Sequence, residues 1–241
     1  MKLYVRMGMA LIFMVSCALL CSCHAEGRAL TNELKTRPII LPSGKAYQGE
    51  AVFFRIIKRA NDLEGFGRLE AFIEDSSGQF KFYKSWDICT YSGALGPKLK
   101  EGDGQSPEGF YFVNRGRLNP NSSYHLSFNL GYPNAYDRAH GRTGSFLMVH
   151  GSCVSIGCYA MTNDNIEQIY TLLEQALDGG QPFVRVHVFP FEMSAENLAK
   201  VSDNPNLPFW KNLKDGWDWF ENNRRPPDVS VVNKRYHFAV D

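Results

Sequence analysis

Short segments in which apolar and polar residues alternate are the feature that most limits what this 241-residue chain can fold into. Residues 69–73 and 80–86 alternate in this way, and the turn-rich link 74–78 between them predicts a β-hairpin. Further strands are expected at 52–57, 109–113, 124–130, 146–150 and 184–189. A chain of this length can bury one sizeable core, so we expect a mixed α/β, β-rich fold.

Two helices are predicted in the last third of the chain. After a cap at Thr162 or Asn163, apolar residues recur at three- and four-residue spacing and stop at Gly179 and Gly180. An aromatic stripe then marks one face of a C-terminal helix: Phe209, Leu213, Trp217 and Phe220. Such a stripe more often belongs to a core than to a glycan-binding groove, and we favour the core. Residues 229–238 predict a short strand pair.

The N-terminus has the pattern of a secretory signal peptide. Lys2 and Arg6 precede an apolar run over residues 7–20, which is shorter than the roughly 20 residues that span a bilayer. Two processing routes fit residues 1–25. Residues 20–23 resemble a bacterial lipobox, which would leave a lipidated Cys23 as a membrane anchor, whereas cleavage after Ala25 would leave no anchor. Export is expected by either route.

Charge argues against a nucleic-acid partner. The chain has 26 Lys and Arg against 25 Asp and Glu, a formal net charge of +1. Without Lys2 and Arg6, residues 26–241 have a formal net charge of −1. A protein with no basic field has no general attraction for phosphate backbones. The aromatic content of 13% also separates the chain from disordered proteins.

Three of the six cysteines are expected to remain, in an oxidising compartment, when the signal peptide and possible lipobox are set aside: Cys89, Cys153 and Cys158. The count is odd, so at least one thiol stays free or pairs between chains. A disulfide between Cys153 and Cys158 and one between Cys89 and Cys153 both stay open, and we favour the second. These cysteines and nearby histidines lack paired metal-ligand spacings, so no metal is expected.

The stretch from His150 to Met161 holds the strongest chemical signal. A histidine ends an apolar strand, a glycine-containing turn follows, and Cys158 opens what reads as a helical pattern. A cysteine at a helix N-terminus near an imidazole is expected to favour the thiolate. Gly157 permits a tight turn, and the amides of Gly157, Cys158 and Tyr159 are candidates for an oxyanion hole. His150 is the candidate base.

His-Gly followed by Ser-x-Gly-Cys resembles the active-site signature of the L,D-transpeptidase (YkuD-like) catalytic domain, whose members are cysteine enzymes of bacterial peptidoglycan. The resemblance covers roughly residues 50–235, and its upstream parts are 91–98, 102–103, 106–111 and 134–141. The sequence is most similar to the YafK/DpaA-type branch, which has Ser-Ile-Gly-Cys-Tyr-Ala-Met, here residues 155–161, and Pro-Asn-Ala-Tyr-Asp-Arg-Ala-His-Gly, here residues 133–141.

The resemblance implies a β-sandwich-type catalytic domain with a helix after the cysteine and an added C-terminal helix. The expected division is a signal peptide over 1–25, a linker or approach segment over 26–50, the catalytic domain over 51–190 and a packed helical extension over 191–241. By position Cys158 is the nucleophile, His150 the base, and Ser155 and Gly157 shape the turn. The implied setting is the periplasm of a Gram-negative bacterium, without a cofactor.

Two departures from the wider family bear on the reaction. Ile156 stands where the family usually has His or Lys, and Ala160 stands where it has Arg or Asn. The loop between His150 and Cys158 is also shorter. A cationic substrate contact is therefore missing, and the branch is associated with an amidase that releases Braun-type lipoprotein from diaminopimelate. The implied partners are meso-diaminopimelate stem peptides and a linked lipoprotein or outer-membrane protein.

Other functions and site residues stay open. The chain could instead be a transpeptidase that forms 3-3 cross-links or attaches proteins, or a non-catalytic peptidoglycan-binding protein. His140 is the rival base because its distance along the chain from the cysteine is closer to the family's usual value. Arg138 and Asp137 are candidates for binding the zwitterionic end of diaminopimelate, or they form a local ion pair. Tyr91 is a further substrate-binding candidate.

Overall fold

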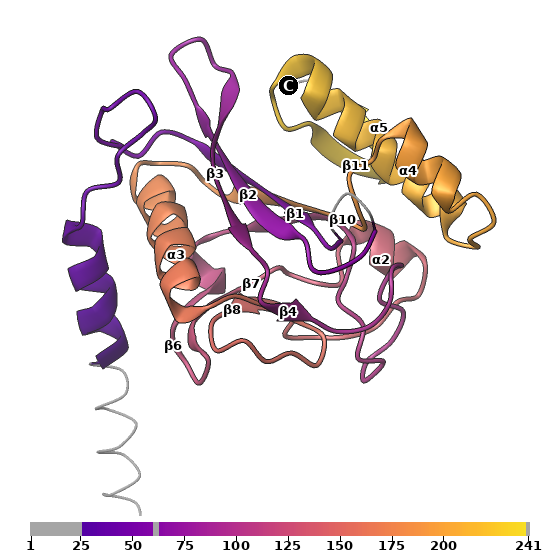
Figure 1. The fold of residues 1–241 in the computed structure, drawn as a ribbon, viewed down its shortest axis with the longest axis horizontal. Coiled ribbons are helices and arrows are strands. Elements are labelled where there is room, and N and C mark those ends of the chain that lie inside the picture. Colours follow the sequence, from indigo (N-terminus) through magenta and orange to yellow (C-terminus); the bar gives the residue numbers. More distant parts are fainter. Residues whose placement is uncertain (1–25, 60–62, 240–241) are drawn as a thin grey trace, which may run out of the picture.

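A computed structural model describes residues 26–59 and 63–239 (Figure 1). The first of its two five-stranded sheets has the order β3-β2-β1-β10-β5. Its strands are β1 (Val52–Ile57), β2 (Arg68–Glu74), β3 (Phe80–Asp87), β5 (Gly109–Val113) and β10 (Val184–Phe189). β1 runs parallel to β10, and the other pairs are antiparallel. The strands expected from alternation, including the β2–β3 hairpin, are therefore present.

The second sheet has the order β4-β9-β8-β7-β6. Its strands are short: β4 (Thr90–Tyr91), β6 (Leu118–Ser122), β7 (His125–Asn129), β8 (Met148–His150) and β9 (Tyr159–Ala160). β8 and β9 are parallel neighbours, and the other pairs are antiparallel. This sheet matters for function because β8 ends at His150 and β9 begins directly after Cys158.

The main core lies between the two sheets. It joins Phe54 and Ile56 of the first sheet to Phe128 and Val149 of the second, and all four are fully buried. Helix α3 (Asn163–Asp178) packs its apolar face into the same core. Its cap is Thr162, whose side chain accepts the backbone N–H of Asn165 at 3.2 Å. The result is the mixed α/β, sheet-rich fold that the sequence predicted.

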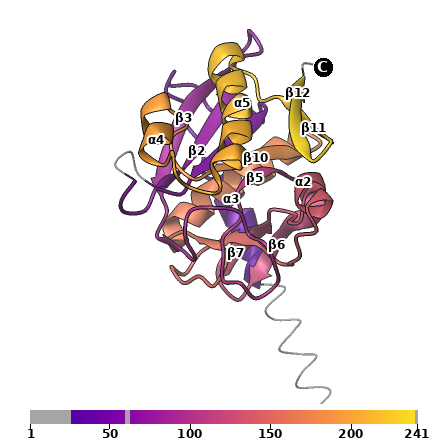
Figure 2. The same ribbon diagram turned by 90° about the vertical axis from the view of Figure 1, so that its right-hand side faces the viewer.

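A third layer covers the other face of the first sheet (Figures 1 and 2). It consists of α4 (Ala195–Lys200), α5 (Leu207–Asn223) and the hairpin of β11 (Asp228–Val232) with β12 (Arg235–Ala239). Alternate residues of β1 face opposite layers: Phe54 enters the main core, whereas Phe53 meets Phe220 of α5 with ring centroids 4.8 Å apart. The aromatic stripe of α5 is therefore core, as its spacing predicted. The short helix α2 (Ala135–Ala139) lies beside this layer.

Residues 26–36 are helical, although the sequence predicted a linker or approach segment over 26–50. Leu34 is buried, and Lys35 pairs with Glu174 at 3.2 Å and with Asp178 at 3.0 Å on α3. Apolar contacts of Leu30 and Leu34 with the main core and these two ion pairs hold the short helix in place. The expected signal peptide, lipobox and Cys23 lie outside the described residues. Among the helices described, none is long and apolar enough to cross a membrane.

Candidate active site

Cys158 and His150 line one pocket of about 500 Å³ on the second sheet. The parallel register of β8 and β9 pairs His150 with Ala160. Residues two apart along a strand point to the same face, so the Cys158 and His150 side chains share a face. Tyr124 and Phe146 also line this pocket, which we call the catalytic pocket. The structure thus brings together the two residues that the motif nominates as nucleophile and base.

The surroundings of His150 suit a general base. The side chain is buried, and Nδ1 lies 2.6 Å from the carbonyl oxygen of Gly151. A carbonyl only accepts hydrogen bonds, so Nδ1 carries the proton and Nε2 keeps its lone pair. The Tyr124 ring lies against the imidazole at a centroid distance of 4.8 Å. Burial lowers the pKa of His150, although the bond to Gly151 opposes the shift, so the ring is neutral at pH 7.

The surroundings of Cys158 differ from those expected from sequence. Cys158 does not open a helix: it precedes β9, and α3 begins only at Asn163. The thiol therefore does not stand at the N-terminus of α3. Burial raises the pKa of Cys158, and the Met148 N–H, 3.4 Å from Sγ, and the charge of Lys98 only partly oppose this shift. At rest the pair is a neutral thiol and a neutral imidazole, and deprotonation must accompany attack on a substrate.

The turn before Cys158 is held by hydroxyl groups. Ser155 Oγ accepts the Gly157 N–H at 3.2 Å and donates to the Cys158 carbonyl oxygen at 2.7 Å. Ser106 Oγ donates to the same carbonyl at 3.0 Å. Gly157 has φ +139°, which L side chains rarely adopt. The Tyr159 side chain is buried and donates to the Pro107 carbonyl at 2.6 Å, so only its backbone could serve an oxyanion.

Beneath the turn lies a buried ion pair that the sequence did not reveal. Lys58 Nζ lies 3.0 Å from Glu108 Oε1, and both side chains are fully buried. Lys58 also donates to the carbonyls of Ala94 and Ser106, at 3.0 and 3.1 Å. Glu108 accepts the Trp210 indole N–H of α5 at 2.9 Å. The pair fixes the segment that carries Ser106. It was not predictable from the sequence, because a single lysine at the end of a strand has no distinctive pattern.

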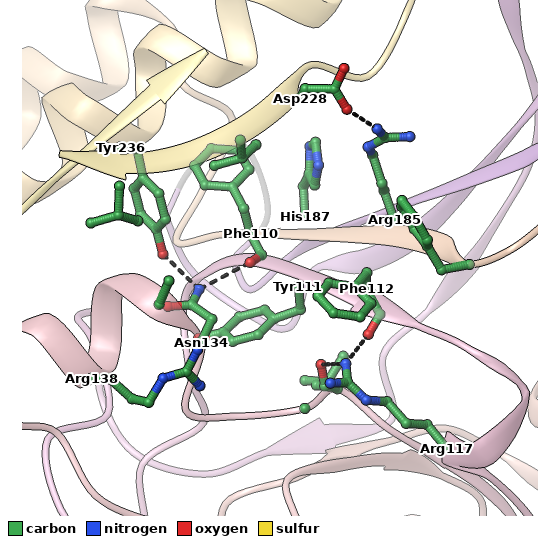
Figure 3. Close-up of a pocket in the computed structure, with 16 residues that line it drawn as sticks. Phe110, Tyr111, Phe112, Arg117, Asn134, Arg138, Arg185, His187, Asp228 and Tyr236 are labelled. Carbon is green, nitrogen blue, oxygen red and sulfur yellow. Dashed lines mark hydrogen bonds and ion pairs between the residues drawn. The ribbon is translucent and has the colours of Figure 1, made fainter. Parts of the chain in front are cut away.

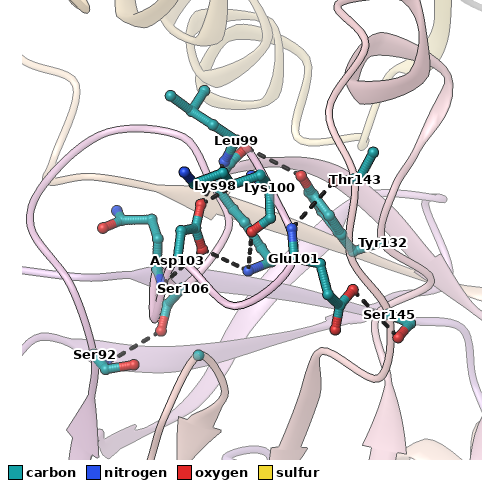
Figure 4. A network of polar contacts seen from close by, with 12 residues as sticks. Ser92, Lys98, Leu99, Lys100, Glu101, Asp103, Ser106, Tyr132, Thr143 and Ser145 are labelled. Atoms are coloured by element: carbon teal, nitrogen blue, oxygen red, sulfur yellow. Dashed lines mark hydrogen bonds and ion pairs between the residues drawn. The ribbon is translucent and has the colours of Figure 1, made fainter.

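A second polar network holds the loop over 98–106 (Figure 4). Lys98 Nζ lies 2.6 Å from Asp103 Oδ1, and Asp103 also accepts backbone N–H groups, including that of Leu99. Burial opposes ionisation of Asp103, but these hydrogen bonds lower its pKa to about 2. Thr143 donates its N–H to the Leu99 carbonyl at 3.1 Å. This loop is thereby tied to the segment that leads into Phe146 of the catalytic pocket.

Three candidates from the 133–141 run do not line the catalytic pocket. The Asp137 carboxylate is buried, 2.8 Å from Arg142 and 3.1 Å from the Tyr111 hydroxyl, and it caps α2. Of the two alternatives left open for Asp137, the structure shows a local ion pair, with Arg142 rather than Arg138, so the carboxylate is unavailable to a substrate ammonium group. Arg138 is exposed and lines another pocket. His140 is exposed, and its Nδ1 lies 2.9 Å from its own helix's Tyr136 carbonyl.

Tyr91 is also packed away from the catalytic pocket. Its ring is buried against Tyr159 and beneath the Lys58 ammonium group, which lies 5.2 Å from the ring centroid. By contrast, the sequence did not single out Ser127, which lies opposite His150 in the β7–β8 register and lines the catalytic pocket. The Ser127 hydroxyl is buried and has no hydrogen-bond partner among the described residues. It lies behind the surface of the pocket, next to the strand that ends at His150.

The cysteines divide between structure and chemistry. Cys89 and Cys153 form a disulfide with an S–S distance of 2.04 Å, the pairing that the sequence analysis favoured. Cys158 is the free cysteine of the described chain. Within residues 26–59 and 63–239, no group of three or more His, Cys, Asp or Glu side chains is placed to hold a metal ion.

The rim of the catalytic pocket is apolar. Ile156 and Phe146 are 91% and 77% exposed, and Val154 stands beside them with 53% exposure. Single exposed apolar side chains are common on protein surfaces, but these three line the same pocket, and such a group is typical of a binding surface. No Asp, Glu, Lys or Arg of the described chain is among the residues that line the pocket. No lining residue therefore replaces the cation that is missing at Ile156, and the charge that reaches the Cys158 thiol is that of Lys98, outside the lining.

Comparison with known proteins agrees with the geometry. The profile of the L,D-transpeptidase catalytic domain (YkuD) matches residues 72–188. The chain is 42% identical to YafK of Escherichia coli K12 and of strain O157:H7 over 225 residues, covering 93% of this chain and 89% of each relative. The name of those relatives carries L,D-transpeptidase as a provisional assignment.

Two solved structures resemble the chain more distantly. The helical cell shape determining protein Pgp2 of Campylobacter jejuni is 19% identical, with a TM-score of 0.43 over 86% of this chain and 80% of that one. Bd1075 of Bdellovibrio bacteriovorus is 17% identical, with a TM-score of 0.38 over 71% of this chain and 58% of that one. On the profile match and the identity to YafK, this chain belongs to the L,D-transpeptidase (YkuD-like) family.

Proposed function

We propose that the protein is a cysteine amidase of the cell wall that hydrolyses the amide between meso-diaminopimelate and a covalently attached, Braun-type lipoprotein. The observation that carries this proposal is the catalytic pocket, where a free thiol and an imidazole with an available Nε2 stand on one face. These are the nucleophile and base that acyl transfer through a thioester requires. The likeness to YafK and the YkuD match support peptidoglycan as the substrate class.

The first half-reaction forms the acyl-enzyme. As Cys158 Sγ attacks the diaminopimelate carbonyl carbon, its proton moves to His150 Nε2. The tetrahedral oxyanion is stabilised by the backbone N–H of Cys158, because the Gly157 N–H is already bonded to Ser155 Oγ. When the intermediate collapses, the C–N bond breaks, and the imidazolium returns the proton to the departing amine of the lipoprotein. The stem peptide remains on Cys158 as a thioester.

In the second half-reaction His150 takes a proton from water, and the hydroxyl attacks the thioester. The C–S bond breaks, the thiol regains its proton, and the diaminopimelate carboxyl group is released. Water is favoured over an amine acceptor by the pocket itself. A second diaminopimelate would bring an ammonium and a carboxylate group, and the described lining contains no charged partner for either. The apolar rim suits contact with the polypeptide that leaves.

The disulfide supports a location for the protein in the cell. A disulfide between Cys89 and Cys153 is typical of proteins in an oxidising compartment, which supports export to the periplasm of a Gram-negative cell. Anchoring through a lipidated Cys23 stays a prediction.

One digestion separates the alternatives. Muropeptides that carry a lipoprotein remnant are incubated with the wild type, Cys158→Ala and, as a matched control, Ser152→Ala, and the products are followed by mass spectrometry. We expect the wild type and Ser152→Ala to release the remnant and Cys158→Ala to release none. New 3-3 cross-links or newly attached peptide would instead indicate transpeptidation. Unchanged muropeptides with every variant would indicate a non-catalytic binding protein.

A further inference from the structure

A second pocket, of about 330 Å³, lies at the outer edge of the first sheet, between β5, residues 131–138 and the β11–β12 hairpin (Figure 3). It shares no residue with the catalytic pocket. Three arginines line it, from three different elements: Arg117, Arg138 and Arg185. We call it the arginine pocket. The run that contains Arg138 was expected to serve the catalytic site, and the structure places this arginine here instead.

Arg117 is held in place without a countercharge. Its Nη1 donates to the Leu130 carbonyl at 3.2 Å and to the Phe112 carbonyl. A Cβ at Gly131 would lie 2.0 Å from Nη1, so the glycine makes room for the guanidinium group. Burial lowers the pKa of Arg117, the direction expected for a cation that no neighbouring acid compensates. These contacts use Nη1 and leave Nε and Nη2 for a ligand.

Arg138 repeats this arrangement from the other side of the pocket (Figure 3). Its Nη1 donates to the Pro133 carbonyl. No carboxylate of the described residues lies within ion-pair distance of Arg117 or Arg138, whereas Arg185 is paired with Asp228. The arginine pocket therefore contains two uncompensated guanidinium groups and one balanced pair. Most other arginines of the described chain have an acidic partner, so this concentration of free positive charge is local.

The pocket also contains a buried polar group without a partner. His187 is 1% exposed, its ring lies between those of Phe53 and Phe110 at 4.6 and 4.7 Å, and its Nδ1 has no hydrogen-bond partner among the described residues. Burial lowers its pKa well below the usual value, so the ring is neutral. A buried polar atom left unsatisfied costs free energy, so the wall of the arginine pocket carries an unpaired nitrogen that the fold itself does not satisfy.

We propose that the arginine pocket is a second binding site, which takes the carboxylate groups of a peptidoglycan stem peptide other than the one being cleaved. The inference rests on the proposed function for the identity of the acidic peptide. Each guanidinium fork can bind a carboxylate through two parallel hydrogen bonds. Phe112 and Phe183, whose centroids are 5.4 Å apart, supply an apolar wall for aliphatic parts of the peptide. Inorganic phosphate has no aliphatic part that could contact this wall.

The function of this site is retention on the polymer. Stem peptides repeat along peptidoglycan, so an enzyme with two sites holds one peptide while it acts on the next. Linking two weak contacts raises overall affinity for the polymer without changing affinity for a single soluble peptide at the catalytic pocket. The two pockets therefore predict different behaviour on intact sacculi and on small soluble substrates.

The test uses full-length protein, with sedimentation on intact sacculi as one measurement and turnover of a small soluble muropeptide as the other. The variants are Arg138→Gln, Arg117→Gln with Arg138→Gln, and Arg115→Gln as control, because Arg115 pairs with Asp178 outside the pocket. We expect affinity for sacculi to fall about tenfold for each pocket arginine removed, as for loss of a charge-assisted hydrogen bond, and kcat on the soluble substrate to stay unchanged.

Competition identifies the ligand. Addition of the soluble stem tripeptide should release the wild type from sacculi, and an equal concentration of inorganic phosphate should not. Release by phosphate alone, or retention of Arg138→Gln equal to that of the control, would overturn the proposal. Arg138 is exposed and its substitution should leave the fold intact, so loss of folding in the double variant cannot obscure the result. Failure of the proposed function would appear separately, as absent turnover in every variant.

Discussion

The catalytic pocket and the arginine pocket use charge in opposite ways. In the first, thiol and imidazole are both neutral, the lining has no charged side chain in the described chain, and the rim is apolar. In the second, two guanidinium groups stand without acidic partners. A neutral, partly desolvated site suits a reaction in which charge develops only in the transition state, because preorganised dipoles then act on it strongly. Unpaired cations suit recognition of an anion.

The contrast extends to the residues beneath each pocket. Below the catalytic turn, Lys58 and Glu108 are fully buried and paired, so their charges are satisfied inside the protein. In the arginine pocket, Arg117 and Arg138 bond only to backbone carbonyls. Charge that belongs to the fold is thus internally compensated, and charge left uncompensated is available to a ligand. The next predictions test this division.

The largest expected effect is that of removing the base. In His150→Gln, hydrogen bonding is kept but no group accepts the thiol proton, so kcat/KM should fall by about 10²- to 10⁴-fold. Burial lowers the pKa of His150, so kcat/KM of the wild type should fall only when the pH drops below the ordinary histidine pKa of about 6.5. The variant's residual rate should instead rise steadily with pH, following the thiolate. A control, His140→Gln, should behave like the wild type.

Equal losses in His140→Gln and His150→Gln would break this assignment of the base. An acid limb well above pH 6.5 in the wild type would also contradict it, because a raised histidine pKa would mean that the imidazole is charged at rest.

A smaller effect, on stability rather than chemistry, should separate the buried pair from the free arginines. Glu108→Gln leaves Lys58 buried without its countercharge, which should lower the free energy of unfolding by about 3–5 kcal/mol. Arg138→Gln removes an exposed, unpaired charge and should change it by less than about 0.5 kcal/mol. Denaturant unfolding of both variants measures the difference. The double variant Lys58→Met with Glu108→Gln should recover part of the lost stability. Equal losses in Glu108→Gln and Arg138→Gln would contradict the distinction between compensated and uncompensated charge.

Elements with a clear apolar period and residues that belong to a motif were predictable from the sequence. The strands of the first sheet, α3 and α5 have residues enough for alternation or a stripe to appear, and His150 and Cys158 lie in a compact motif. The second sheet was harder, because β4 and β9 have only two residues each and depend on tertiary pairing. Because β9 is too short to give a pattern, Cys158 was expected to begin a helix, whereas it precedes this strand.

Residues that act through long-range contacts were not predictable from local patterns. Glu108 meets Trp210 from 102 positions away, and Ser127 reaches the catalytic pocket only through the β7–β8 register. Asp137 is the opposite case. It lies in a run that resembles the family, so substrate binding was one interpretation, but its carboxylate is buried and paired with Arg142. The sequence indicates which chemistry is available, and the fold decides which groups are free to perform it.

The most direct test of the central claim is to trap the Cys158 thioester with hydroxylamine. Lipoprotein-bearing muropeptides are digested with and without hydroxylamine, and the released diaminopimelate groups are analysed by mass spectrometry. We expect the wild type to form the hydroxamate at the expense of the free carboxylate, and Cys158→Ala to form neither. Release of the free carboxylate by Cys158→Ala, or release by the wild type with no hydroxamate at any hydroxylamine concentration, would contradict it.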